Sequence, residues 1–89
     1  MTSVDVIIRG RVQGVGFRWT ARHIAQGFAV TGFVKNLEDR RVELVAEGSA
    51  TEVDHFLAAI AERLGRNIRD VAVTDAPVTG EFATFEIVH

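Results

Sequence analysis

The chain has 89 residues, of which 47% are hydrophobic and 25% charged, with one proline, no cysteine and a net charge of −2. That length suits one small domain, residues 1–89, with one compact core. The hydrophobic fraction is too high and the net charge too small for intrinsic disorder. No apolar run approaches the roughly 18 residues of a membrane span. The lack of cysteine excludes disulfides and thiolate zinc sites.

The N-terminus and the charge distribution indicate where the protein is located and what kind of ligand it binds. Residues 1–5 lack the basic and apolar regions of a signal peptide, so we expect a cytoplasmic protein. Residues 1–41 carry a net charge of +4 and residues 42–89 a net charge of −6. A basic first half fits an anionic ligand, but the chain lacks the overall positive charge of a nucleic-acid binder.

The apolar pattern predicts five strands and two helices. Alternation indicates strands at residues 4–10, 29–37, 41–47, 68–74 and 84–88. Apolar residues with helical spacing indicate a first helix that starts at Phe17 and stops at Gly27. A second helix follows Ser49, which we expect to form a capping box with Glu52, and it ends at Gly65. Its predicted buried stripe is Val53, Phe56, Leu57, Ile60 and Leu64.

The order β-α-β-β-α-β with an added terminal strand predicts the fold class α+β. It is typical of the ferredoxin-like fold, a βαββαβ sandwich in which an antiparallel sheet carries two helices on one face. A short C-terminal strand completes the expected sheet.

The most informative segment is the glycine-rich loop that precedes the first helix. Gly10, Gly14 and Gly16 permit the positive φ angles of a concave nest of backbone N–H groups, and the helix N-terminus adds partial positive charge. The Rossmann pattern fails because Trp19 stands where its third glycine belongs, and no Gly-Lys-Ser/Thr tripeptide exists. The loop therefore suits a single phosphate.

Two polar residues are candidates for that site. Arg18 falls in the first helical turn, where the helix dipole opposes a cation unless an anion is bound. Asn36 sits late in the second strand, although asparagine is disfavoured in strands. The residues alone leave open that Arg18 is an ordinary surface arginine and that Asn36 serves the turn.

Two blocks of the sequence resemble the acylphosphatase signature. Residues 10–18 run Gly-Arg-Val-Gln-Gly-Val-Gly-Phe-Arg, and residues 32–36 run Gly-Phe-Val-Lys-Asn. The resemblance continues through residues 42–48, the second helix and residues 85–87. It implies the ferredoxin-like fold and the hydrolysis of acyl phosphates to a carboxylate and phosphate, with Arg18 binding the phosphate and Asn36 positioning the attacking water.

On this basis we hypothesise direct attack by water, with no covalent intermediate, no cofactor and no metal. The phosphoryl oxygens would bind Arg18 and backbone N–H groups. The substrate phosphate would take the proton, as is proposed for the family. The expected phosphate-binding loop consists of the N–H groups of Gln13, Gly14, Val15, Gly16, Phe17 and Arg18.

The serine and histidine residues of the sequence fit a mechanism without a covalent nucleophile and without a metal. Neither Ser3 nor Ser49 lies beside a histidine, so a serine nucleophile is not expected. His23 should face solvent, about 140° around the helix from Arg18. His55 and His89 lie elsewhere, and three scattered histidines make no metal site.

The sequence departs from the family pattern at two turns. Asp39-Arg40 stands where Asp-Gly is usual, and a non-glycine residue in a left-handed turn costs about 1–2 kcal/mol. Gly65-Arg66 stands where Gly-Pro is usual. Both changes lie away from the glycine loop, so they affect local geometry rather than the expected chemistry.

Three other functions remain as alternatives. One is an RNA-binding ferredoxin-like module, although no aromatic cluster lies on one strand. Another is a domain like the N-terminal part of hydrogenase maturation carbamoyltransferases, although we expect nothing attached after residue 89. The third is an anion sensor without turnover. The expected partners are a small acyl phosphate and inorganic phosphate, with no nucleic acid, no membrane and a monomeric state.

Overall fold

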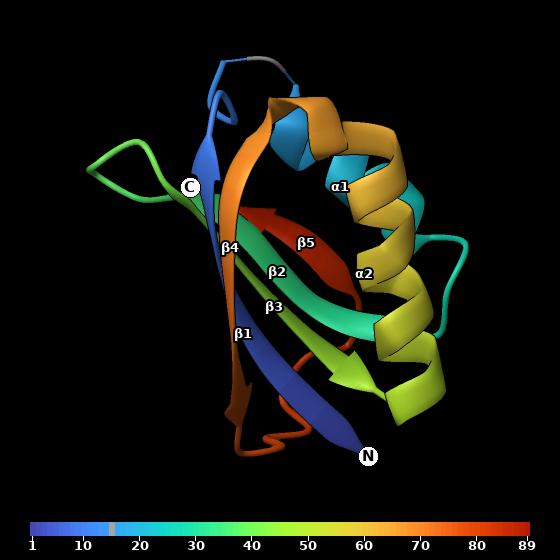
Figure 1. Cartoon of the computed structure of the whole chain (residues 1–89). Coiled ribbons are helices and arrows are strands. Elements are labelled where there is room, and N and C mark those ends of the chain that lie inside the picture. Colours follow the sequence, from blue (N-terminus) through green and yellow to red (C-terminus); the bar gives the residue numbers. More distant parts are fainter. Residues whose placement is uncertain (15) are drawn as a thin grey trace.

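The computed structural model describes residues 1–14 and 16–89. Within them the predicted order of elements is confirmed, and each strand begins and ends within two residues of its expected place (Figure 1). A short 3-10 helix, η1, occupies the turn where the family usually has Gly-Pro. The elements are β1 (Thr2–Gly10), α1 (Phe17–Ala25), β2 (Val30–Asn36), β3 (Val42–Gly48), α2 (Ala50–Leu64), η1 (Gly65–Asn67), β4 (Ile68–Ala76) and β5 (Phe85–Val88).

The strands form one sheet in the order β4-β1-β3-β2-β5. β1 pairs antiparallel with β3 and β4, and β2 pairs antiparallel with β3. The ferredoxin-like class is thus confirmed. The terminal strand differs from its neighbours because β5 runs parallel to β2. Residues 77–84 carry the chain from β4, at one edge, to the other edge of the sheet, where β5 joins (Figure 1).

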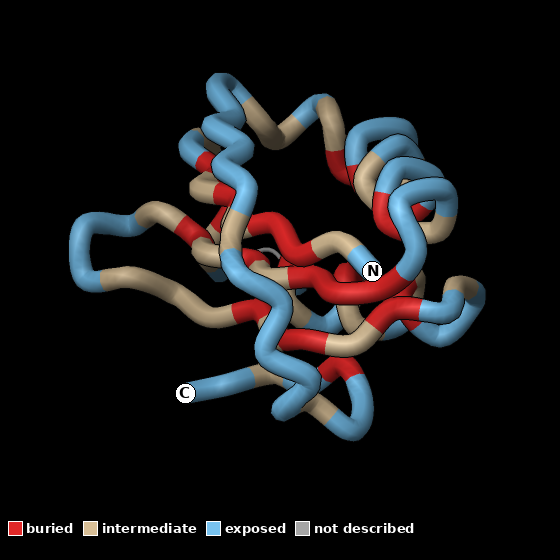
Figure 2. Tube along the Cα trace, turned by 90° about the horizontal axis from the view of Figure 1, so that it is seen from below, coloured by how far each residue is buried: buried red, intermediate tan, exposed pale blue. Residues whose placement is uncertain are grey.

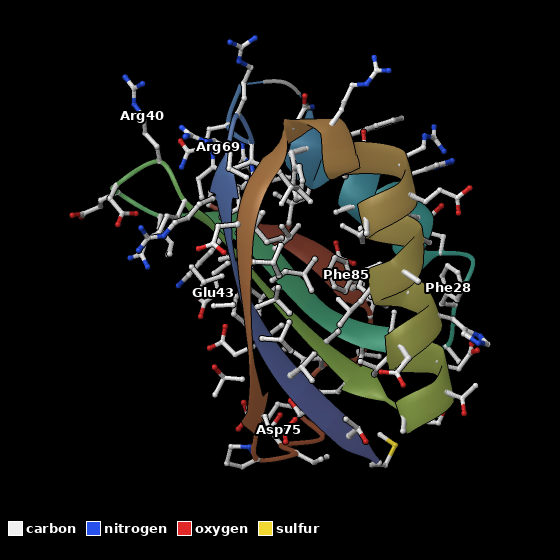
Figure 3. The ribbon with its side chains drawn as sticks, viewed as in Figure 1. Phe28, Arg40, Glu43, Arg69, Asp75 and Phe85 are labelled. Carbon is white, nitrogen blue, oxygen red and sulfur yellow. The ribbon has the colours of Figure 1, made fainter. Side chains whose placement is uncertain are left out.

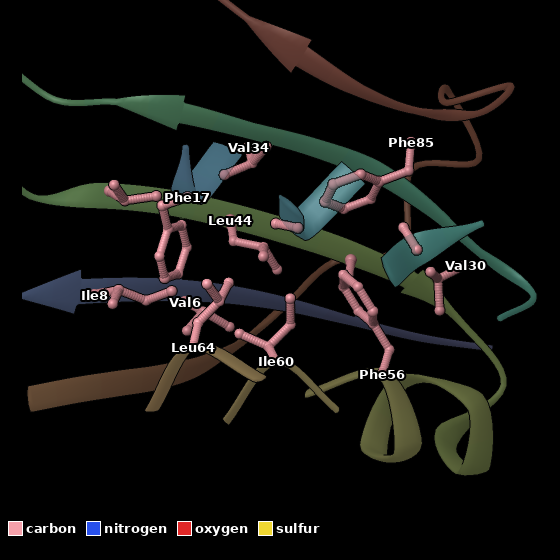
Figure 4. Packing of buried hydrophobic residues seen from close by; sticks show 14 of the residues in the cluster. Val6, Ile8, Phe17, Val30, Val34, Leu44, Phe56, Ile60, Leu64 and Phe85 are labelled. Atoms are coloured by element: carbon pink, nitrogen blue, oxygen red, sulfur yellow. The ribbon is translucent and has the colours of Figure 1, made fainter. Parts of the chain in front are cut away.

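Both helices cover the same face of the sheet, and the core lies between them and the strands (Figure 1). Phe17 of α1 and Phe56 of α2 are fully buried there, beside Val34 and Leu44 of the sheet (Figure 4). Phe85 packs edge-on against Phe56 at 5.3 Å between ring centroids, which fixes β5 to the core. Buried residues follow the central strands and the inner helix faces, whereas the loops are mostly exposed (Figure 2).

The helix ends differ from the sequence prediction in two details. α1 ends at Ala25, so Gly27 lies in the following turn and not at the helix terminus. Ser49 caps α2 as expected, since its Oγ accepts the N–H of Glu52 at 3.1 Å. The second half of the capping box is wrong, because the Glu52 carboxylate accepts the N–H of Ala29 at 2.8 Å. Glu52 therefore ties the turn after α1 to α2.

The β2–β3 hairpin keeps its left-handed residue despite the sequence change. Arg40 has a φ of 71°, the conformation in which the family usually places glycine. The Leu37 N–H donates to the Arg41 carbonyl at 2.8 Å, and the Arg41 guanidinium binds the Asp39 carboxylate at 2.6 Å. These contacts hold the turn, while the left-handed conformation of Arg40 costs about 1–2 kcal/mol.

None of the helices in residues 1–14 and 16–89 has the length and apolar character needed to span a membrane.

Candidate active site

The loop between β1 and α1 contains two glycines with the positive φ angles that an anion-binding nest uses. Gly14 and Gly16 both have a φ of 77°, in the left-handed region. A Cβ atom at either position would meet nothing within 4 Å, so the backbone angle and not crowding calls for glycine there. Left-handed residues of this kind turn neighbouring N–H groups toward one point. Val15 and its predicted phosphate contact lie outside the described residues.

The start of α1 adds further donors to this loop. The Thr20 N–H donates to the Gly16 carbonyl at 2.9 Å and closes the first helical turn. The N–H groups of Phe17, Arg18 and Trp19 come before that of Thr20 in the chain. The first N–H groups of an α-helix have no carbonyl partner within the helix, so these three are free to bind a ligand. The first turn also carries no acidic side chain. This helix N-terminus therefore favours an anion.

Arg18 lies beside the glycine loop in a hollow of about 280 Å³. The structure thus brings together the predicted guanidinium, both left-handed glycines and the first helical turn. Phe17 is only 1% exposed, and its burial in the core anchors this end of the helix. The lining residues are Val12, Gly14, Gly16, Phe17, Arg18, Trp19, Ile87 and His89.

Gln13 has a role that the sequence did not indicate. Its side-chain Nε2 donates to the carbonyls of Leu37 and Arg41, both at 2.9 Å. The prediction concerned only its backbone N–H. The side chain ties the loop to the base of the β2–β3 hairpin, directly after Asn36. No local pattern could reveal this contact, because the partners are 24 and 28 positions along the chain.

Asn36 is the last residue of β2 and lies outside the lining of the hollow. Val34, two residues earlier, is fully buried beneath the helices. Since side chains alternate along a strand, Asn36 shares that face of the sheet with α1. Its Oδ1 is buried and accepts no hydrogen bond within the described part of the chain. A buried acceptor without a partner is costly, and a water molecule would satisfy it.

His89 is the site residue that the sequence missed. Its Nδ1 lies 3.4 Å from Nη1 of Arg18. The three histidines seemed unrelated in the sequence, and only the parallel pairing of β5 with β2 brings this one to the loop. His23 is exposed and stacks on Trp19 at 5.7 Å, as expected for a solvent-facing residue. The described residues include no group of three His, Asp or Glu side chains that could hold a metal ion.

A second, larger and strongly basic hollow of about 710 Å³ lies at the end of β1. Neither Arg18 nor Gly14 and Gly16 line it. Figure 3 shows Arg40 of the hairpin and Arg69 of β4 on the same side of the molecule. Such a charged surface attracts anions over a distance. Its lining residues are Arg9, Gly10, Arg11, Arg40, Arg69 and Asp70.

Together, these observations describe a ferredoxin-like α+β domain in which two left-handed glycines and an arginine meet at the start of the first helix. The acylphosphatase family model matches residues 4–87. The acylphosphatase of Methylococcus capsulatus is 44% identical over all of this chain and 98% of its own length. That of Lactobacillus johnsonii is 37% identical over the full length of both proteins. The chain therefore belongs to the acylphosphatase family, and the predicted enzyme class, a hydrolase, is confirmed.

Solved structures agree with this assignment. The crystal structure of acylphosphatase from Bacillus subtilis matches with a TM-score of 0.88 and 33% identity, over all of both chains. The structure of full-length HypF in the phosphate- and nucleotide-bound form matches with a TM-score of 0.83 and 28% identity. That match covers 99% of this chain but only 12% of HypF. The chain therefore corresponds to an entire acylphosphatase relative and to a small part of HypF.

Proposed function

We propose that residues 1–89 act as one monomeric, cytoplasmic acylphosphatase domain. It converts acyl phosphates to a carboxylate and inorganic phosphate and requires neither a membrane nor a nucleic acid. The observation that carries the proposal is the single hollow that Arg18 shares with Gly14 and Gly16 at the start of α1. A sensor without turnover would need the guanidinium and the backbone donors to bind an anion, but not a buried amide oxygen, such as that of Asn36, that is free to hold a water molecule.

The phosphoryl group of the substrate binds to the loop. The N–H groups of residues 13–18 donate to its oxygens, and the guanidinium of Arg18 donates two parallel hydrogen bonds. The bound anion also reverses the unfavourable interaction between Arg18 and the helix dipole. These donors act most strongly on the charge that the phosphoryl oxygens carry in the transition state.

A water molecule then attacks phosphorus in line with the leaving carboxylate. Asn36 Oδ1 accepts a hydrogen bond from this water and orients it. The new bond joins the water oxygen to phosphorus, and the bond between phosphorus and the carboxylate oxygen breaks. The bonding electrons leave with the carboxylate, and a proton of the water passes to a phosphoryl oxygen. The good leaving group allows this small site to act without a covalent nucleophile.

The acyl group contacts the apolar part of the hollow. Trp19 is 65% exposed at its rim, and Val12 and Ile87 line it. Because this surface is shallow and offers few polar contacts, it discriminates little between acyl groups. Benzoyl phosphate is therefore a suitable test substrate.

The proposal is tested by steady-state hydrolysis of benzoyl phosphate with competing inorganic phosphate. Arg18→Ala should lower kcat/KM by about 10² to 10³ fold and weaken phosphate inhibition. Asn36→Ala should lower kcat by about 10² fold and leave phosphate inhibition unchanged. Arg22→Ala is the matched control, because it removes a cation from the same helix. Among the described residues, Arg22 forms an exposed ion pair with Glu86 and does not line the hollow. Full turnover by Arg18→Ala would exclude the proposed site.

A further inference from the structure

The side chains of Arg18 and His89 meet at the candidate site from opposite ends of the chain. Arg18 Nη1 and His89 Nδ1 are 3.4 Å apart, and both residues line the hollow. This distance is at the long end of hydrogen bonding, so the contact directs the guanidinium without locking it. Among the described residues, none of the ion pairs involves Arg18. The imidazole is thus the polar side chain that orients this arginine.

The pairing of β5 with β2 carries His89 to the candidate site. β5 runs parallel to β2, with Val34 opposite Ile87 and Lys35 opposite Val88. Ile87 packs against the core beneath the helices and lines the same hollow as His89 and Arg18. His89 follows β5 directly, so the end of this strand brings the imidazole to the arginine on α1.

The chemistry of the two partners decides which of them donates. A guanidinium has no acceptor, so Arg18 donates and His89 Nδ1 accepts. Because that ring nitrogen faces Arg18, the effect of His89 on the reaction passes through Arg18.

We propose that His89 is a positioning residue whose imidazole holds the guanidinium of Arg18 toward the phosphate loop. The proposal rests on the proposed function of Arg18. Arginine carries considerable rotamer entropy, and an acceptor at the site reduces the entropy that is lost when the phosphate binds. A carboxylate would also orient Arg18, but its negative charge would repel the phosphoryl group. An acceptor nitrogen carries no such charge, so the full positive charge of Arg18 remains for the substrate.

Two substitutions separate the acceptor from the rest of the side chain. His89→Asn keeps an acceptor at the δ position, whereas His89→Leu removes the acceptor. At pH 7.5 we expect His89→Leu to lower kcat/KM for benzoyl phosphate about tenfold and to raise the inhibition constant of inorganic phosphate by a similar factor. His89→Asn should stay within about threefold of wild type. His55→Asn, an exposed position on α2, is the matched control.

A double-mutant cycle completes the test. In an Arg18→Ala background, His89→Leu should have no further effect on kcat/KM or on phosphate inhibition. An equal effect of His89→Leu in both backgrounds overturns the positioning role. If Arg18→Ala alone is fully active, the proposed function fails instead.

Discussion

Glu47 is a buried carboxylate that fastens the crossover between β4 and β5 to the sheet. It is 2% exposed and lies on β3, on the face opposite the helices, since Ala46 and Leu44 point into the core. One carboxylate oxygen, Oε2, accepts from the hydroxyl of Ser3 at 3.1 Å and from the N–H and hydroxyl of Thr79 at 3.1 and 3.0 Å. The other, Oε1, accepts the Gly80 N–H at 3.1 Å. The same crossover also packs Phe82 against Phe33, at 5.8 Å between ring centroids.

The substitution Glu47→Gln tests this anchor with little change in volume. The amide oxygen of glutamine can replace Oε2 and keep its three hydrogen bonds. The amide nitrogen then faces the Gly80 N–H, so that one part-buried backbone donor loses its partner. Such a loss costs about 1–3 kcal/mol. For a domain of this size, a loss of about 2 kcal/mol lowers the unfolding temperature by about 8–16 °C.

The pH dependence of stability gives a second, independent measure. Burial raises the pKa of the Glu47 carboxyl, but the four hydrogen bonds lower it by more, so its pKa lies below the usual range. A depressed pKa in the folded state contributes stability above the unfolded-state pKa of about 4.3. That contribution is lost as the pH falls through the folded-state value. The stability difference between wild type and Glu47→Gln should therefore shrink below about pH 4.5.

The free energy of unfolding is measured by urea titration from pH 7 to pH 3 for wild type, Glu47→Gln and Glu81→Gln. Glu81 is exposed in the same crossover and provides the matched control. Burial and the nearby Asp5 carboxyl raise the pKa of Glu43, so Glu43 changes the stability with pH in the opposite direction. Because Glu43 is present in all three proteins, its contribution cancels when they are compared at the same pH. If Glu47→Gln is as stable as Glu81→Gln at pH 7, or if its deficit does not vary with pH, the anchor is misassigned.

Three further predictions concern the loop, the hairpin and the chemistry. Gln13→Leu removes both hydrogen bonds to the hairpin, so kcat/KM for benzoyl phosphate should fall about tenfold, and unchanged kinetics would show that the loop holds its shape alone. Arg40→Gly removes a left-handed strain of about 1–2 kcal/mol from the folded state. The greater chain entropy of glycine stabilises the unfolded state by about 0.5–1 kcal/mol, which offsets part of this gain. The substitution should therefore raise the unfolding temperature by a few degrees, and a lower temperature would refute the strain argument. Dialysis against EDTA should leave turnover unchanged, whereas a loss restored by a divalent cation would contradict the water-attack mechanism.

The sequence alone indicated the elements and the position of the anion site. Strand alternation, helical spacing and the Ser49 cap are local patterns, and each depends on residues within a few positions of one another. The glycine loop is local too, because glycine permits the positive φ angles that Gly14 and Gly16 adopt. These features could be predicted because short-range backbone geometry sets them.

The tertiary structure decided which distant side chains contact the glycine loop and Arg18. No local pattern determines that β5 pairs in parallel with β2, that Gln13 reaches the hairpin, or that His89 meets Arg18 across 71 positions. The partners of Glu47 are equally distant, since it lies 44 residues from Ser3 and 32 from Thr79. Such contacts depend on how the finished sheet and helices pack. The sequence therefore predicted the candidate phosphate site, and the fold supplied the side chains that contact its loop and its arginine.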